Sequence, residues 1–256
     1  MTSDKTKEEP VQNAKNTETN EASKAEPWLP EYYPERIQGA FKQTWLQCMF
    51  GINMNHKVEQ TRCEHKVHDC IKKSPLIKLM MAALKSSGCE IDIRRHISCE
   101  GCLKGVSGGY DAHLNQIVVC YNNAVTKSTV QGVLAHEMVH MFDYCRNKVD
   151  FKNLDHLACT EIRAANLVHC SFLSSWIEGY ASPFNIKKAH RDCVIDKAVQ
   201  SIVAIKKVSK DEALAAVLRV FPKCYADLEP VGRRIRRNSL DTQRAYAEGP
   251  IYGYDI

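Results

Sequence analysis

The sequence feature that most constrains this chain is the pentapeptide His136-Glu-Met-Val-His140. Histidines at positions i and i+4 share one face of a helix, where both imidazoles can reach a single ion. The apolar residues around the motif recur at helical spacing and predict a long helix over roughly residues 128–146. The chain must therefore fold around a helix with a metal site on one face and a buried opposite face.

The glutamate that follows the first histidine indicates what such a site would do. Glu137 follows His136 directly, and in this motif its carboxylate takes a proton from an activated water. A zinc ion supplies the remaining activation, because it acidifies water and polarises a carbonyl group. The motif therefore predicts a zinc-dependent peptidase with Glu137 as the base and His136 and His140 as metal ligands.

A catalytic zinc usually has three protein ligands, so a third one must be found. Asp143 and Arg146 stand where a metzincin requires glycine and histidine, which excludes that class. Glu161 lies 21 residues after His140, on the next predicted helix, and is the first candidate. Asp143, more suited to orienting a ligand histidine, and His156 remain open as alternatives.

The rest of the chain predicts an α+β fold, mostly helical with a small sheet, in one zincin-like metalloprotease domain. Residues 1–35 are predicted to be a disordered segment, since residues 1–27 have almost no large apolar side chains, and residues 36–256 form the domain. Capping and turn signals place the remaining elements: a helix from Ser74-Pro75 to Gly88, strands at 91–97 and 116–121, a turn at 107–109, and helices at 155–173, at 191–206 and from Ser209 to before Pro222.

The twelve cysteines, spread evenly from residue 48 onward, predict disulfides formed in an oxidising compartment. Cys99 and Cys102 are expected to pair with other cysteines, although a second zinc site or a redox pair would share this spacing. The N-terminal region shows neither a secretory signal nor a mitochondrial presequence, which conflicts with the cysteine content. No apolar run is long enough to span a bilayer.

Two further segments could contact partners. The strand at 116–121, if it is an edge strand beside the metal helix, could hold an extended peptide by main-chain pairing; otherwise it is a core strand. The arginines at 233–237 are either a solvated tail or a contact for anionic lipid. The net charge of only +5 gives no argument for nucleic acid as a partner.

Several stretches in this order resemble one family. They are Ser98-Cys-Glu-Gly-Cys102, Val106-Ser-Gly-Gly-Tyr-Asp111, Gln116-Ile-Val-Val-Cys120, Ala135-His-Glu-Met-Val-His-Met-Phe-Asp143 and His156-Leu-Ala-Cys-Thr-Glu-Ile-Arg-Ala-Ala-Asn-Leu167. Over residues 60–256 the chain is similar to the mitochondrial inner-membrane metalloproteases that assist ATP synthase assembly, whose animal members are also called Ku-binding proteins. It departs after Leu167, where Val-His-Cys170 replaces a Ser-Gly-Asp-Cys stretch.

The resemblance implies a peripheral inner-membrane protein facing the intermembrane space. It would be imported by oxidative trapping of its cysteines, which would resolve the conflict between many cysteines and no export signal. It implies an endopeptidase that matures a membrane-sector subunit of ATP synthase and assists assembly of that sector. The alternative is an assembly chaperone with little or no proteolytic role. A nuclear DNA-repair role, implied only by the animal name, fits so many cysteines poorly.

Overall fold

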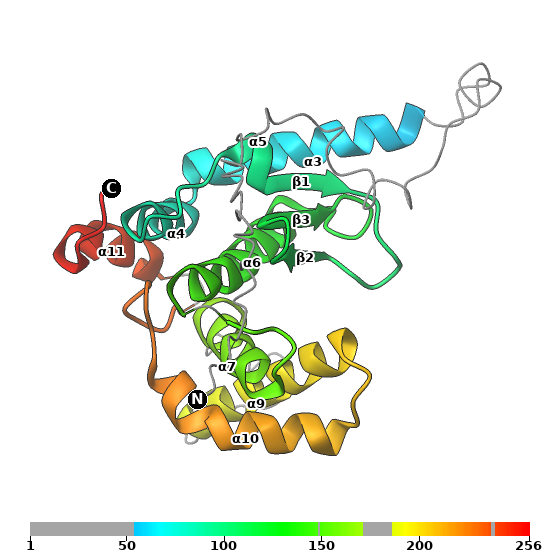
Figure 1. Ribbon diagram of the computed structural model, residues 1–256. Helices are drawn as coiled ribbons and strands as arrows, with labels where there is room; N and C mark the ends of the chain where they lie inside the picture. Colours follow the sequence, from blue (N-terminus) through cyan, green and yellow to red (C-terminus); the bar gives the residue numbers. More distant parts are fainter. Residues whose placement is uncertain (1–53, 148, 171–185, 237–238) are drawn as a thin grey trace, which may run out of the picture. The chain divides into compact units, whose positions relative to one another are not determined.

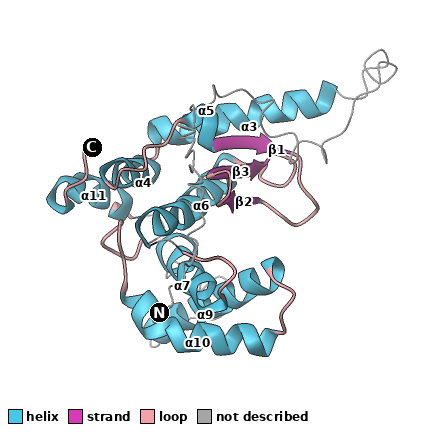
Figure 2. Ribbon diagram, viewed as in Figure 1, coloured by secondary structure: helices cyan, strands magenta, loops and turns pink. Residues whose placement is uncertain are grey.

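A computed structural model describes residues 54–147, 149–170, 186–236 and 239–256. The described residues form helices and one small sheet, which confirms the predicted α+β class (Figures 1 and 2). The helices are α3 (Met54–Lys73), α4 (Pro75–Ser86), α5 (Ile93–His96), α6 (Lys127–Asn147), α7 (Leu154–Ala164), the π-helix η2 (Ala165–His169), α9 (Ile186–Ile205), α10 (Lys210–Ala226), α11 (Asp241–Glu248) and the 3₁₀-helix η3 (Gly249–Tyr252). The predicted disordered segment at 1–35 lies outside the described residues, and the extent of the domain stays a prediction.

The sheet has three strands in the order β1-β3-β2. β1 (Ile97–Glu100) pairs in parallel with β3 (Gln116–Cys120), and β2 (Gly108–Asp111) pairs antiparallel with the other side of β3. The strand predicted at 116–121 is therefore confirmed, but it is central rather than an edge strand. Its residues Ile117 and Val119 are fully buried, which explains the central place. The edge strand in contact with α6 is β2.

The strand predicted at 91–97 is wrong for all but its last residue. The Asp92 carboxylate accepts a hydrogen bond from the Arg94 backbone N–H at 2.9 Å, and this cap begins the short helix α5. The Asp92 N–H in turn donates to His96 Nδ1 at 2.9 Å. These local side-chain bonds compete with extended pairing, so β1 begins only at Ile97.

The turn predicted at 107–109 is also wrong, because Gly108 and Gly109 are the first residues of β2. A Cβ atom on Gly108 would lie 2.3 Å from Val133 Cγ1 and 2.7 Å from the Val118 carbonyl oxygen. Glycine at position 108 thus allows the edge strand to lie close against α6.

The predicted helix starts are confirmed where side chains cap them. Ser74 caps α4, and Ser209 and Glu212 form the predicted capping box of α10. The predicted end of α10 before Pro222 is wrong, because the helix continues to Ala226. A proline removes only one hydrogen bond of the ladder, while the buried side chains of Phe221 and Cys224 hold the last turns against the core.

The buried side chains form two clusters. The first core joins α3, α4, the sheet and most of the buried face of α6, including Leu134 and Met138. The second core joins α7, α9 and α10, including Ile162 and Val217. Figure 1 shows α6 next to α7, with α9 and α10 on the far side of α7. The packing of α6 on α7 is therefore where the two cores meet.

Ten cysteines form five disulfides, which confirms the predicted framework for the described residues. The pairs are Cys63–Cys99, Cys89–Cys145, Cys102–Cys120, Cys159–Cys224 and Cys170–Cys193. Cys99 and Cys102 each pair with another cysteine, as expected. Cys70 is buried as a free thiol among the described residues, and Cys48 lies outside them.

The arginine cluster makes contacts within the chain. Arg233 pairs with Glu248, Arg234 donates to Asn166 and stacks on Tyr225, and Arg236 pairs with Asp241. Each of these three side chains thus has a partner within the chain, while Arg234 and Arg236 remain exposed. The lipid-contact alternative stays a prediction, and Arg237 lies outside the described residues.

None of the helices in the described part of the chain combines the length and the apolar character needed to cross a bilayer.

Candidate metal centre and substrate cavity

The structure brings His136, His140 and Glu161 together. Helix α6 places the two imidazoles on one face with their Nε2 atoms 3.0 Å apart. Glu161 Oε2 lies 3.6 Å from His136 Nε2, and Glu161 Oε1 lies 3.5 Å from His140 Nε2. One candidate ligand atom from each residue lies within 4.8 Å of the others.

Helix α7 delivers the glutamate because of how it begins and packs. Asn153 caps the helix by accepting from the Asp155 N–H at 2.9 Å. The small residues Ala164 and Ala165, where α7 meets η2, are buried at 0% and 2% exposure. Glu161 is consequently turned inward toward α6 and is only 1% exposed.

The three side chains fit a zinc ion. Ligand atoms about 2.1 Å from a tetrahedral ion are about 3.4 Å apart. The two Nε2 atoms are 3.0 Å apart here, and each lies 3.5 or 3.6 Å from one oxygen of Glu161. Glu161 Oε1 is buried and has no hydrogen-bond partner among the described residues. Such an orphaned carboxylate oxygen is costly unless a cation or a donor satisfies it.

Burial shapes the charge of these groups. It lowers the pKa of His140 to about 3 and the pKa of His136 well below its usual range, so both imidazoles are neutral and able to bind a metal. Burial raises the pKa of Glu161 to about 7, against a hydrogen bond from Ser201. Burial, helped by Glu161, also raises the pKa of Glu137 well above its usual range. A cation at this place would offset the desolvation of both carboxylates.

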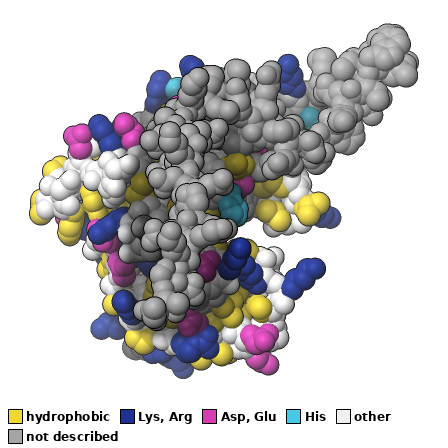
Figure 3. Space-filling view, viewed as in Figure 1, with side chains coloured by type: hydrophobic (Ala, Val, Ile, Leu, Met, Phe, Trp, Pro, Cys, Tyr) yellow, Lys and Arg dark blue, Asp and Glu magenta, His cyan; other side chains and the backbone are white. Residues whose placement is uncertain are grey.

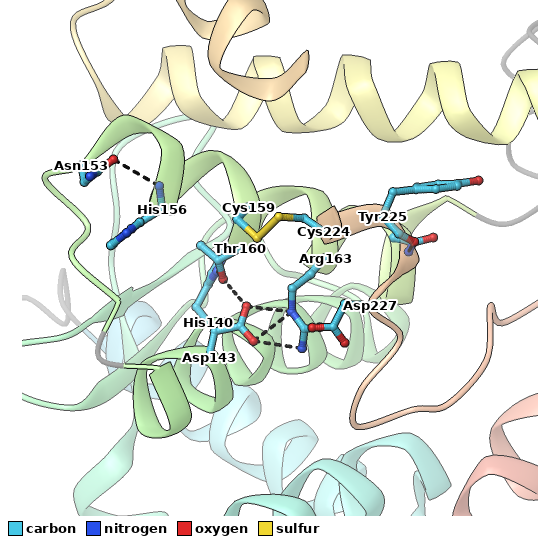
Figure 4. Close-up of a disulfide and its surroundings, with 11 residues drawn as sticks. His140, Asp143, Asn153, His156, Cys159, Thr160, Arg163, Cys224, Tyr225 and Asp227 are labelled. Atoms are coloured by element: carbon cyan, nitrogen blue, oxygen red, sulfur yellow. Dashed lines mark hydrogen bonds and ion pairs between the residues drawn. A yellow bond between two sulfur atoms is a disulfide. The ribbon is translucent and has the colours of Figure 1, made fainter. Parts of the chain in front are cut away.

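The other two candidate ligands lie elsewhere. Asp143 forms a buried ion pair with Arg163 and accepts a hydrogen bond from Thr160 at 2.7 Å (Figure 4). His156 Nδ1 accepts from the Asp150 N–H at 3.2 Å. Neither belongs to the group of side chains that could hold a metal.

The structure adds three side chains that sequence reasoning did not single out. Thr160 Oγ1 lies 2.8 Å from His140 Nδ1, and His169 Nε2 lies 2.8 Å from His136 Nδ1. Ser201 on α9 hydrogen-bonds the Glu161 carboxylate. Only His169 carried a sequence signal, because it falls in the departure after Leu167; it ends a π-helix, a rare form that is often found at functional sites.

The candidate metal group opens into a cavity of about 1010 Å³. One wall is β2 with the preceding loop, from Gly105 to Asp111. The opposite wall is α9, which carries Lys197, together with Lys206 just after the helix ends. Glu137 also lines the cavity. Figure 3 shows a histidine at the recess of this face and lysine or arginine side chains below it.

Comparison with known proteins gives consistent matches. A profile of the Peptidase M76 family matches residues 61–232. "Mitochondrial inner membrane protease ATP23 homolog" of Homo sapiens is 40% identical over 206 residues, which cover 79% of this chain and 80% of the relative. The protein of the same name from Danio rerio is 42% identical, with 84% and 82% covered.

The fungal protein "Mitochondrial inner membrane protease atp23" of Schizosaccharomyces pombe is 36% identical, over 67% of this chain and 92% of the relative. No solved structure matches the chain. The family match covers α6 and α7, the helices that carry His136, His140 and Glu161. The chain therefore belongs to the Peptidase M76 family, with the mitochondrial inner membrane protease ATP23 and its homologues.

Proposed function

We propose that this chain is a zinc-dependent endopeptidase with a zincin-like domain, in which His136, His140 and Glu161 hold one zinc ion and Glu137 is the general base. The observation that carries the proposal is the buried Glu161 carboxylate between two neutral imidazoles, with an oxygen, Oε1, that has no hydrogen bond among the described residues. Membership in a peptidase family supports the same chemistry.

The residues would divide the reaction as follows. When bound, zinc supplies Lewis-acid polarisation of the scissile carbonyl and acidifies the attacking water. Glu137, in the cavity, takes the proton from that water and later delivers it to the nitrogen of the leaving amine. Burial raises the pKa of Glu137 toward neutral pH, where one group can both accept a proton and return it.

The substrate would be an extended peptide lying along β2. This strand has one hydrogen-bonded strand partner in the described part of the chain, and its whole length lines the cavity. An edge strand can hold a peptide by main-chain pairing, with loose sequence preference. The strand at 116–121, for which this role was one of two alternatives, is enclosed by β1 and β2, so we assign the role to β2.

We further propose that the protein is peripherally bound to the inner membrane on its intermembrane-space side, matures a membrane-sector subunit of ATP synthase and assists its assembly. The names of the relatives support an inner-membrane protease. Five disulfides support an oxidising compartment. The subunit and the side of the membrane rest on the family resemblance.

Metal content tests the site. Oxidised wild-type protein is expected to hold about one zinc per chain, and His136→Ala is expected to lose it. The matched control is His68→Ala, because His68 is exposed on α3, outside the cavity. Equal zinc content in wild type and His136→Ala would refute the proposed ligand set.

The sizes of newly made ATP synthase membrane-sector subunits in mitochondria test the substrate. Glu137→Gln is expected to accumulate a longer precursor, whereas Glu64→Gln, an exposed change on α3, is not. If Glu137→Gln leaves subunit sizes unchanged and fully restores assembly in cells that lack the protein, the chaperone alternative gains and the proteolytic substrate lies elsewhere.

A further inference from the structure

A buried chain of hydrogen bonds lies behind His140, on the side away from the metal group. His140 Nδ1 is 2.8 Å from Thr160 Oγ1, and the Thr160 hydroxyl donates to Asp143 Oδ2 at 2.7 Å (Figure 4). The exposed fractions of these three residues are 5%, 1% and 3%. Water therefore does not compete for these bonds, and the three residues satisfy one another.

Asp143 sets the donor-to-acceptor direction of these hydrogen bonds. Arg163 Nε donates to both carboxylate oxygens of Asp143, at 3.0 and 3.1 Å, inside the protein. A guanidinium is always charged, and its fork-shaped contact holds the partner as a carboxylate, which can only accept hydrogen bonds. The single hydroxyl proton of Thr160 is thus committed to Asp143.

We propose that Thr160 is a positioning residue that fixes the tautomer of His140, an inference that rests on the proposed zinc site. Since the Thr160 proton points to Asp143, its oxygen accepts from His140, and His140 must carry its proton on Nδ1. The lone pair is then on Nε2, the atom that faces His136 and Glu161. The imidazole is prepared as a ligand before any ion arrives.

The chain is fixed at its far end as well. Arg163 pairs with Asp227 and donates to the Glu229 carbonyl, in the segment that follows α10. The residue before Thr160 is Cys159, whose disulfide with Cys224 holds α7 to the end of α10. Figure 4 shows this disulfide beside the hydrogen-bond chain. This relay, the hydrogen-bonded series His140, Thr160, Asp143 and Arg163, thus joins α6, α7 and the segment after α10.

The other histidine is supported differently. His136 Nδ1 faces His169 Nε2, and His169 is exposed at the end of η2. The contact of His140 with the Thr160 hydroxyl therefore makes its prediction for the tautomer of His140 alone.

The first experiment measures histidine tautomers in the metal-free, oxidised full chain by ¹⁵N NMR. His140 is expected as the Nδ1–H form. In Asp143→Asn the amide can donate to Thr160, which frees the Thr160 proton for His140 and is expected to shift it to the Nε2–H form. An Nε2–H form in the wild type, or an unchanged tautomer in folded Asp143→Asn, would overturn the proposal. This readout needs no metal, so it separates the relay from the zinc-site proposal.

The second experiment measures zinc affinity by competition with a chromophoric chelator. Thr160→Val keeps the shape but removes the hydroxyl, and is expected to weaken zinc binding roughly 10–100-fold, as for other partners of metal-bound histidines. Thr160→Ser should restore affinity to near the wild-type value. Thr61→Val, an exposed change on α3, is the control. Folded Thr160→Val with wild-type affinity would refute the role of the hydroxyl.

Discussion

Replacing Gly108 by alanine tests how closely the edge strand lies against the metal helix. The new Cβ would stand 2.3 Å from Val133 Cγ1 and 2.7 Å from the Val118 carbonyl oxygen, so β2 must move away from α6 or from β3. Overpacking of this kind costs about 1–3 kcal/mol. Alanine also reduces the freedom of the unfolded chain, which returns about 0.4–1 kcal/mol. We therefore expect a net loss of about 1–2 kcal/mol.

Gly109 is the matched control, because a Cβ there would meet nothing within 4 Å. Gly109→Ala is expected to be neutral or slightly stabilising. Thermal unfolding of the oxidised proteins should show Gly108→Ala melting roughly 2–8 °C below wild type, at about 2–4 °C per kcal/mol for a chain of this size. Peptide cleavage should fall while zinc content stays unchanged, since the displaced strand forms the cavity wall and not the metal site. If the two alanine variants melt together, the contact between β2 and α6 is not as described.

Three further predictions concern stability. Arg163→Ala leaves the Asp143 carboxylate buried and without its ion-pair partner, and should lower the free energy of unfolding in urea by about 3–5 kcal/mol. Arg219→Ala breaks an exposed ion pair and should lower it by about 1 kcal/mol or less. Equal losses would contradict the burial of the first pair. Replacing Cys159 and Cys224 by alanine opens a loop of 65 residues and should lower the free energy of unfolding by about 4 kcal/mol. Replacing Cys102 and Cys120, which are 18 residues apart, should lower it by roughly 3 kcal/mol, because a shorter loop restricts the unfolded chain less. The reverse order would contradict this entropic explanation. Hydrogen bonds from Arg236 hold the pKa of Asp241 well below its usual range. The stability that the ionised Asp241 contributes is therefore present above about pH 4 and is lost as the pH falls toward its folded-state pKa. The melting temperature of Asp241→Asn should fall less than that of wild type between pH 7 and pH 3, and equal falls would refute this.

The helix of the metal motif could be predicted because its information is local. Two histidines four residues apart and an apolar face specify both the helix and the side chains that share it. Glu161 could be placed as a candidate because the next helix had to pack on the first. Its actual position depends on how α7 packs on α6, a tertiary contact that the spacing in the sequence permits but does not determine.

Other features depend on contacts that no local pattern reveals. Thr160 is an ordinary helix residue in the sequence, and its role follows only from the closeness of α6 and α7. Gly108 and Gly109 have the composition of a turn, yet pairing with β3 draws them into a strand. Asp92 had the opposite effect, because its cap ended the predicted strand before it formed.

The distribution of the disulfides has a consequence for motion. Three of the five described bridges join elements around the sheet, α3, α4 and α6, and two join α7, η2, α9 and α10. Among the described cysteines, none bridges from one half to the other. His136 and His140 belong to the first half and Glu161 to the second, so a bound ion would crosslink two halves that no described disulfide connects. Disulfide formation would thus restrict motion within each half, while a bound metal would restrict the motion of the two cavity walls relative to each other.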